Sequence, residues 1–122
     1  MGKKRILLVE DDRSLQLALR YFLEDMGYET VVAEDHAQAA QAIGEGPFAA
    51  AIVDYFLGDV PTSRLIAELQ RRHPLMPLVC STGASAEQIR IEEGSSPPTA
   101  YLFKPFGVNE LRVTMQALFP QD

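Results

Sequence analysis

Three consecutive acids, Glu10, Asp11 and Asp12, follow a short apolar segment of the chain and precede an amphipathic one. A further acid, Asp54, ends another apolar segment. Carboxylates that are brought together repel each other unless a cation lies between them or one of them is protonated. Their oxygens are hard ligands that suit Mg²⁺, which typically takes one or two protein carboxylates and a phosphate oxygen. These residue types predict a divalent metal site that is completed by a phosphoryl group.

Asp54, Lys104 and Thr82 supply groups that phosphoryl transfer uses. A carboxylate attacks phosphorus to give an acyl phosphate when a metal offsets the repulsion between the two anions. Lys104 offers a compact positive charge just after an apolar segment, and Thr82 offers a hydroxyl at the end of another. Phosphoryl transfer depends mainly on positioning and charge neutralisation. The set therefore matches that reaction better than nucleotide binding, because no glycines follow the first apolar segment to hold a pyrophosphate.

The elements that must position these residues alternate along the chain. Short apolar segments predict strands at residues 4–9, 29–33, 49–54, 78–82 and 100–103. Helical spacing and capping residues predict helices between Asp12 and Gly27, at 36–43, 61–72 and 85–92, and from Val108 onward. Strands this apolar are buried on both faces, which indicates a doubly wound α/β domain with a five-stranded parallel sheet and five helices.

The carboxyl ends of the strands are where such a sheet binds its ligands. Five polar residues fall at or just beyond those ends: Glu10, Asp11, Asp54, Thr82 and Lys104. Asp12 is interpreted as a helix cap only. The order of the elements thus predicts that the chemically active residues meet at one edge of the sheet.

Composition narrows the function further. The chain has 122 residues, 47% of them hydrophobic, which suits one domain with a buried core. Its net charge of -6 disfavours direct binding to nucleic acid or to an anionic membrane. The single cysteine, Cys80, forms no internal disulfide, and the acids after residue 9 interrupt any signal peptide. We expect a cytoplasmic domain.

At these residues the chain resembles the receiver domain of two-component response regulators. The resemblance covers nearly the whole chain in order and spacing. It rests on Glu10-Asp11, Asp54, Thr82-Gly83, Tyr101 and Lys104-Pro105-Phe106. It implies a flavodoxin-like (CheY-like) fold with sheet order 2-1-3-4-5. We expect residues 1–122 to form a single receiver domain, with no output domain encoded in them.

The resemblance implies roles for the acids at the site. Asp54 would be the phosphoacceptor, Asp11 a direct Mg²⁺ ligand and Glu10 a ligand through water. Asp54 itself and the backbone carbonyl of Phe56 would complete the protein ligands.

The resemblance also implies roles for residues of the last two sheet strands. Thr82 would bond the phosphoryl group and Lys104 would pair with it. Tyr101 would be a switch aromatic that moves inward when Thr82 is drawn toward the phosphoryl group, and the bond before Pro105 would be cis.

The implied partners are proteins. A histidine kinase or a histidine phosphotransfer protein would donate the phosphoryl group. A downstream protein or output domain would bind the face formed by the helix at 85–92, the strand at 100–103 and the last helix, and a homodimer is left open. The domain would hydrolyse its own aspartyl phosphate slowly and would not be a turnover enzyme.

Two alternatives belong to other classes. One is a non-phosphorylated pseudo-receiver that acts as a protein interaction module. The other is an aspartate-nucleophile phosphohydrolase, which commonly carries a second aspartate two residues after the nucleophile; Phe56 stands there in this chain.

Four departures from the family pattern modify these expectations. Gly58 replaces a common proline, so the loop after Asp54 is expected to be more mobile. Phe56 and Ala84, which would flank the phosphoryl group, are both apolar and cannot position a water, which predicts slow self-dephosphorylation. The segment Gly94–Thr99 contains two prolines, which predicts a short preceding helix and an unusual output face.

Overall fold

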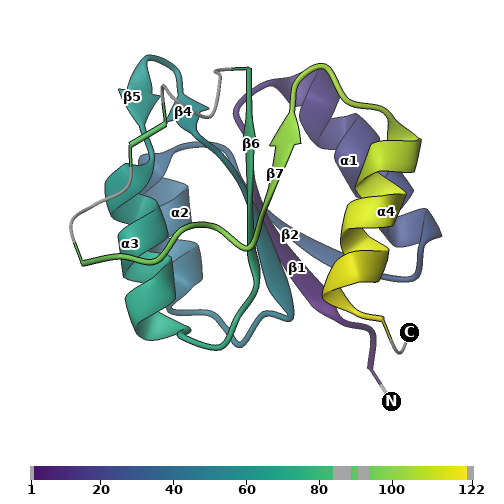
Figure 1. Cartoon of the computed structure of the whole chain (residues 1–122), viewed down its shortest axis with the longest axis horizontal. Helices are drawn as coiled ribbons and strands as arrows, with labels where there is room; N and C mark the ends of the chain where they lie inside the picture. Colours follow the sequence, from purple (N-terminus) through teal and green to yellow (C-terminus); the bar gives the residue numbers. More distant parts are fainter. Residues whose placement is uncertain (1, 84–88, 91–93, 121–122) are drawn as a thin grey trace.

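A computed structural model of the chain describes residues 2–83, 89–90 and 94–120. Within this part, five parallel strands form one sheet in the order β2-β1-β3-β6-β7 (Figure 1). The strands are β1 (Arg5–Val9), β2 (Glu29–Ala33), β3 (Ala50–Asp54), β6 (Leu78–Thr82) and β7 (Ala100–Phe103). The predicted parallel sheet and its order 2-1-3-4-5 are confirmed, because β4 and β5 belong to a separate small hairpin.

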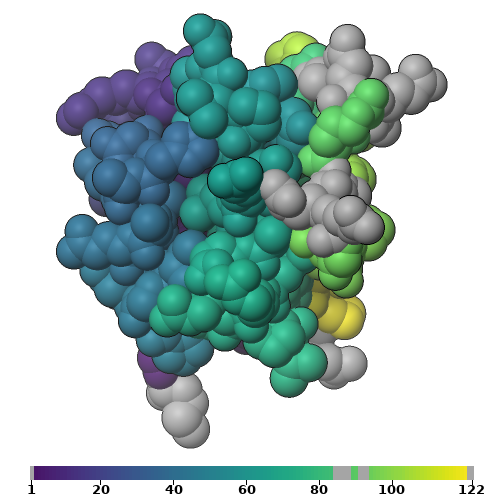
Figure 2. All heavy atoms as spheres, turned by 90° about the vertical axis from the view of Figure 1, so that its left-hand side faces the viewer, coloured from purple at the N-terminus to yellow at the C-terminus, as the bar shows by residue number. Residues whose placement is uncertain are grey.

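Four helices cover the two faces of the sheet in the described part: α1 (Arg13–Asp25), α2 (His36–Ile43), α3 (Ser63–Arg72) and α4 (Val108–Leu118). Helices α2 and α3 pack on one face, and α1 and α4 on the other (Figure 1). Figure 2 shows the first of these faces, with α2 in blue and α3 in teal. None of the described helices is long and apolar enough to span a bilayer.

Each face of the sheet supports its own hydrophobic core because successive strand residues point to opposite faces. On β3, Ala51 and Val53 face α2 and α3, whereas Ala50 and Ile52 face α1 and α4. All five residues of β3 are buried. This two-sided burial explains why the strands are continuous apolar segments, and it fixes the register that brings their carboxyl ends to one edge.

Local capping chemistry explains where the first two helices begin. Asp12 precedes α1 and its side chain accepts the N–H of Leu15; Asp35 precedes α2 and accepts the N–H of Gln38. Gly27, with φ of +98°, follows the end of α1 in the left-handed conformation that favours glycine. The predicted boundaries of α2, β6 and β7 coincide with the observed ones.

Several predicted elements differ from the observed ones. The strands predicted at 4–9 and 49–54 each begin one residue later, at Arg5 and Ala50. The helix predicted from Pro61 begins at Ser63, because Pro61 pairs with Phe56 in a two-stranded antiparallel hairpin, β4 (Phe56–Leu57) and β5 (Val60–Pro61). The sequence pattern did not indicate this hairpin. The helix predicted at 85–92 lies largely outside the described residues, and its two described positions, Ile89 and Arg90, belong to no helix or strand.

Candidate functional site

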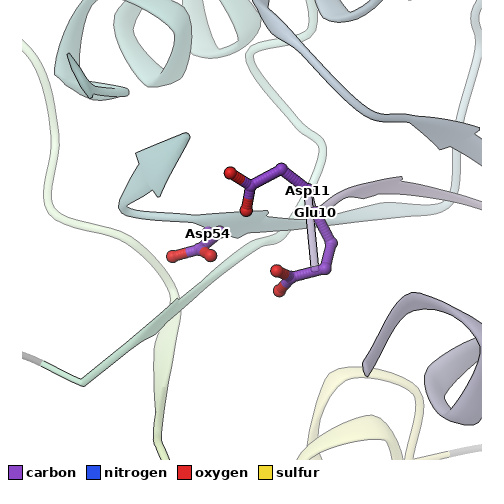
Figure 3. Close-up of side chains that lie close together, drawn as sticks. All are labelled: Glu10, Asp11 and Asp54. Atoms are coloured by element: carbon purple, nitrogen blue, oxygen red, sulfur yellow. The ribbon is translucent and has the colours of Figure 1, made fainter. Parts of the chain in front are cut away.

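Three carboxylates meet at the carboxyl edge of the sheet. Glu10 and Asp11 directly follow β1, and Asp54 is the last residue of the adjacent strand β3. One carboxylate oxygen from each lies within 4.8 Å of the other two. Figure 3 shows the three side chains next to one another. Glu10 and Asp54 are buried, whereas Asp11 is exposed, so the cluster opens to solvent on one side.

Lys104 joins two of these acids. Its Nζ donates to Asp54 Oδ2 at 2.9 Å and to Glu10 Oε1 at 3.3 Å. It follows β7 by one residue, and its backbone N–H donates to the Thr82 carbonyl at 2.8 Å, which holds the ends of β6 and β7 together. Residues 94 positions apart therefore form one ion-paired group, as the placement of polar residues at strand ends predicted.

Burial changes the proton affinity of Glu10. Loss of solvent raises the pKa of Glu10 from 4.5 to about 7, and the charge of Asp54 acts in the same direction. The N–H of Asp12, which donates to Glu10 Oε2 at 3.1 Å, and the charge of Lys104 oppose that rise. Burial would by itself lower the pKa of Lys104, but its bonds to Asp54 and Glu10 outweigh burial and raise it. Lys104 therefore stays positively charged.

Asp11 is held by the hairpin that follows β3. The N–H of Gly58 donates to Asp11 Oδ2 at 2.7 Å. Gly58 has φ of +60° and begins the two-residue turn between β4 and β5, a conformation that glycine adopts without strain. The turn predicted around Gly58 is confirmed, and it contacts the acid cluster directly; whether it is more mobile than a proline-containing loop stays a prediction.

The cluster has the donor chemistry of a Mg²⁺ site. Its ligand atoms are carboxylate oxygens, which Mg²⁺ prefers, and one of the three acids faces solvent, where the ion keeps its waters. When all groups are ionised, three carboxylates and the Lys104 ammonium leave two net negative charges. A divalent cation neutralises that excess, so the residues present fit this ion.

The remaining predicted site residues surround the cluster. The N–H of Phe56 donates to Asp54 Oδ1 at 3.2 Å, while the ligand role of its carbonyl stays a prediction. Thr82 is buried at the end of β6. The predicted cis bond between Lys104 and Pro105 is confirmed. Ala84, the second predicted neighbour of the phosphoryl group, lies outside the described residues.

Tyr101 lies away from the carboxylates, on the sheet face that α2 and α3 cover. It is half-buried against that core, and its ring stacks on Phe103 with centroids 5.7 Å apart. Burial raises the pKa of Tyr101 and raises the pKa of the neighbouring Cys80 thiol to about 12. Cys80 is a buried thiol that forms no disulfide.

Two buried residues that support the site were missed by sequence analysis. The Thr62 hydroxyl lies 2.7 Å from the Asp54 carbonyl and 3.0 Å from the Tyr55 carbonyl, and it fixes the backbone beside Asp54. The Gln16 side chain donates to the Glu10 carbonyl at 3.0 Å. For Gln16, the one available signal was a polar residue on the apolar face of α1. Thr62 gave no signal for its role, because a threonine just before a helix ordinarily indicates a helix cap.

The comparison with protein families gives one clear match. Residues 6–116 match the model of the response regulator receiver domain. The matched range contains all of the site residues described above.

A curated relative agrees with this match. The chain is 33% identical over 118 residues to the virulence transcriptional regulatory protein PhoP of Salmonella typhimurium, a match that covers 97% of this chain and 53% of that protein. The chain thus spans about half the length of this relative.

Solved structures share the fold. Vibrio cholerae chemotaxis protein CheY4 superimposes with a TM-score of 0.85 at 22% identity, covering 97% of this chain and 100% of the other. The response regulator TrrA of Thermotoga maritima, solved in complex with Mg²⁺ and BeF, gives a TM-score of 0.81 at 23% identity, covering 95% and 99%. At these identities the similarity concerns the fold alone.

Proposed function

Because the chain belongs to the response regulator receiver domain family, we propose that Asp54 is its phosphoacceptor and that a phosphohistidine on a partner protein is the donor. One observation carries the proposal: Lys104 bridges Asp54 and Glu10 inside a cluster of three carboxylates. An ammonium held against a strand-ending carboxylate supports charge neutralisation at that oxygen, which phosphoryl transfer requires.

Different residues of the site would perform different parts of the phosphoryl transfer. An Asp54 oxygen forms the new bond to phosphorus, while the bond between phosphorus and the histidine nitrogen breaks and the imidazole leaves with the bonding electron pair. The N–H of Phe56 and the Nζ of Lys104 each hold one oxygen of Asp54, so the carboxylate is oriented before the donor arrives. Thr82 and Lys104 then bond the transferred group.

Mg²⁺ is the proposed cofactor. Glu10, Asp11 and Asp54, with the carbonyl of Phe56, would hold it, Glu10 through a water. When bound, the ion offsets the repulsion between the Asp54 carboxylate and the incoming phosphoryl group. The Gly58 N–H bond orients the Asp11 carboxylate for this role.

The proposed output is a two-state surface. Thr82 would move toward the phosphoryl group and Tyr101 would follow, changing the face formed by β7 and α4. The partners proposed for this face are a downstream protein, an output domain or a second copy, and the proposed donor is a histidine kinase or a phosphotransfer protein. Slow loss of the phosphoryl group and a cytoplasmic location stay predictions.

The alternative of a non-phosphorylated interaction module gains no support. Such a module has no need of a lysine held between two buried acids, because burying charged groups costs free energy unless function or full pairing compensates. The phosphohydrolase alternative lacks its expected second aspartate, since Phe56 occupies that position.

The deciding experiment is an amide NMR titration of the protein with beryllium fluoride, a mimic of an aspartyl phosphate, at saturating Mg²⁺. We expect shifts at Asp54, Thr82 and Lys104 that extend to Tyr101 and α4. Asp54→Asn should abolish them, because the amide cannot hold the mimic.

Asp59→Asn is the matched control, since Asp59 is an exposed acid in the same hairpin and makes no contact proposed for the site. It should titrate like the parent protein. If the parent protein gives no Mg²⁺-dependent response to beryllium fluoride, the proposed function is wrong and the interaction module becomes the better hypothesis.

A further inference from the structure

A buried hydroxyl without a partner lies beside the acid cluster. Ser81, on β6, is 1% exposed, and its Oγ makes no hydrogen bond to any described residue. Leaving such a group unpaired costs free energy, because it loses its hydrogen bonds to water and gains none in the protein. Buried hydroxyls nearly always form a hydrogen bond, so an unpaired one at the edge of the sheet that carries the acid cluster requires an explanation.

The sheet register makes Ser81 the lateral neighbour of Asp54. The two residues are paired between β3 and β6. Ile52 and Val79, two positions earlier on the same strands, both face α1 and α4. Side chains two positions apart share a face, so Asp54 and Ser81 project on the same side from strands about 4.8 Å apart.

The same row continues on the other side of Asp54. Leu8 faces α1 and α4, and Glu10 follows it by two positions at the level of Asp54. Asp54 is therefore flanked by a buried carboxylate on one side and by a buried hydroxyl on the other. Ser81 completes a row of three buried polar side chains at the carboxyl ends of three adjacent strands.

The hydrogen bonds of Asp54 leave room for a further donor. Among the described residues, Phe56 donates to Asp54 Oδ1 and Lys104 donates to Asp54 Oδ2. A carboxylate has about four acceptor positions. Ser81 Oγ makes no hydrogen bond to free Asp54. Phosphorylation adds three acceptor oxygens beyond the Asp54 carboxylate, and a serine changes between staggered rotamers at small cost.

We propose that Ser81 is a positioning residue for the phosphorylated state, with a hydroxyl that is unpaired beside free Asp54 and donates to an oxygen of the Asp54 acyl phosphate. This inference rests on the proposed function. A bond made in one state and missing in the other shifts the equilibrium toward the state that makes it. Ser81 would therefore favour phosphoryl retention without contributing to the stability of the unmodified protein.

The test compares Ser81→Ala with the parent protein in three measurements. We expect the affinity for beryllium fluoride at saturating Mg²⁺ to fall about five- to tenfold, the worth of one hydrogen bond. The affinity for Mg²⁺ alone should stay unchanged. The free energy of unfolding of the unmodified protein should stay equal or rise, because alanine removes an unpaired polar group.

Ser14→Ala is the control, since Ser14 is exposed on α1; it should match the parent protein throughout. Unchanged beryllium fluoride affinity in Ser81→Ala would overturn the inference while leaving the proposed function intact. A clear loss of stability would also overturn it, because the hydroxyl would then be paired before phosphorylation. A parent protein that binds no beryllium fluoride would overturn both proposals.

Discussion

At the scale of single residues, Glu10 is the group whose protonation should be visible in stability. Its pKa is raised by burial from 4.5 to about 7 in the folded protein. Between these two values the folded state binds more protons than the unfolded state. The free energy of unfolding therefore falls as pH rises through this window, and it has lost the full contribution above pH 7.

Glu10→Gln should remove this pH dependence, because the amide does not titrate. In Mg²⁺-free urea denaturation, we expect the parent protein to lose about 2 to 3 kcal/mol relative to this variant between pH 4.5 and 7.5. Glu45→Gln, at an exposed acid, serves as the control and should follow the parent curve. Parallel pH profiles for Glu10→Gln and the parent would show that Glu10 is not the titrating group.

The site residues that could be predicted are those whose chemistry is unusual for their position. An acid or a lysine just after a buried strand is such a signal, and it identified Glu10, Asp54 and Lys104. Thr62 and Ser81 gave no such signal, because a hydroxyl is common in both loops and strands. Their roles depend on which carbonyl or carboxylate the fold places next to them. The local sequence around each residue does not show which distant group that is.

At the scale of elements, the link between β3 and α3 depends on the buried Thr62 hydroxyl. Thr62→Val keeps the shape but removes the bonds to the Asp54 and Tyr55 carbonyls. We expect a loss of about 1 to 3 kcal/mol in the free energy of unfolding, because both carbonyls lose a partner in a dry environment. Chemical shifts should change at Asp54 before any ligand is added.

Thr30→Val is the matched comparison for this link. The Thr30 hydroxyl bonds the exposed side chain of Glu24, where water replaces it readily. Its removal should change stability by less than about 0.5 kcal/mol. Equal costs for the two variants would mean that the hydroxyl of Thr62 does not hold the loop.

A second link joins α3 to the segment before β7. The Gln70 side chain donates to the Ser96 carbonyl at 2.7 Å and accepts the Ser96 N–H at 3.2 Å. Gln70→Ala should speed hydrogen exchange at the Ser96 amide, with a stability loss of only about 0.5 to 1 kcal/mol, because the bonds are exposed. Gln116→Ala, on the exposed side of α4, should leave that amide unchanged. Unchanged exchange in Gln70→Ala would exclude the link.

Helix and strand positions could be predicted wherever the local sequence favoured one type of element clearly over the other. Asp35 and the following apolar spacing located α2, and continuous apolar residues located β6. The predicted start of α3 at Pro61 was wrong, because a proline is tolerated both in the first turn of a helix and in an edge strand of a hairpin. The pairing of Phe56 with Pro61 decided between them, and a two-residue strand has no periodicity to detect.

At the scale of the whole molecule, folding concentrates negative charge that the extended chain keeps apart. The five-stranded sheet brings Glu10, Asp11 and Asp54 together. Lys104 lies among them and forms ion pairs of 2.9 Å with Asp54 and 3.3 Å with Glu10. The folded state should therefore bind Mg²⁺ more tightly than the unfolded chain does. Ligands that bind the folded state preferentially stabilise it by mass action.

Mg²⁺ should raise the thermal midpoint of the protein, and Asp11→Asn should remove most of that rise. At a concentration 100 times the dissociation constant, the stabilisation amounts to about 2.7 kcal/mol, which calorimetry detects readily. Asp12→Asn is the control from the same acidic triplet: Asp12 caps α1, and asparagine caps a helix equally well, so this variant should keep the full response. If both variants keep it, or both lose it, the response reflects net charge and not a site built by the sheet edge.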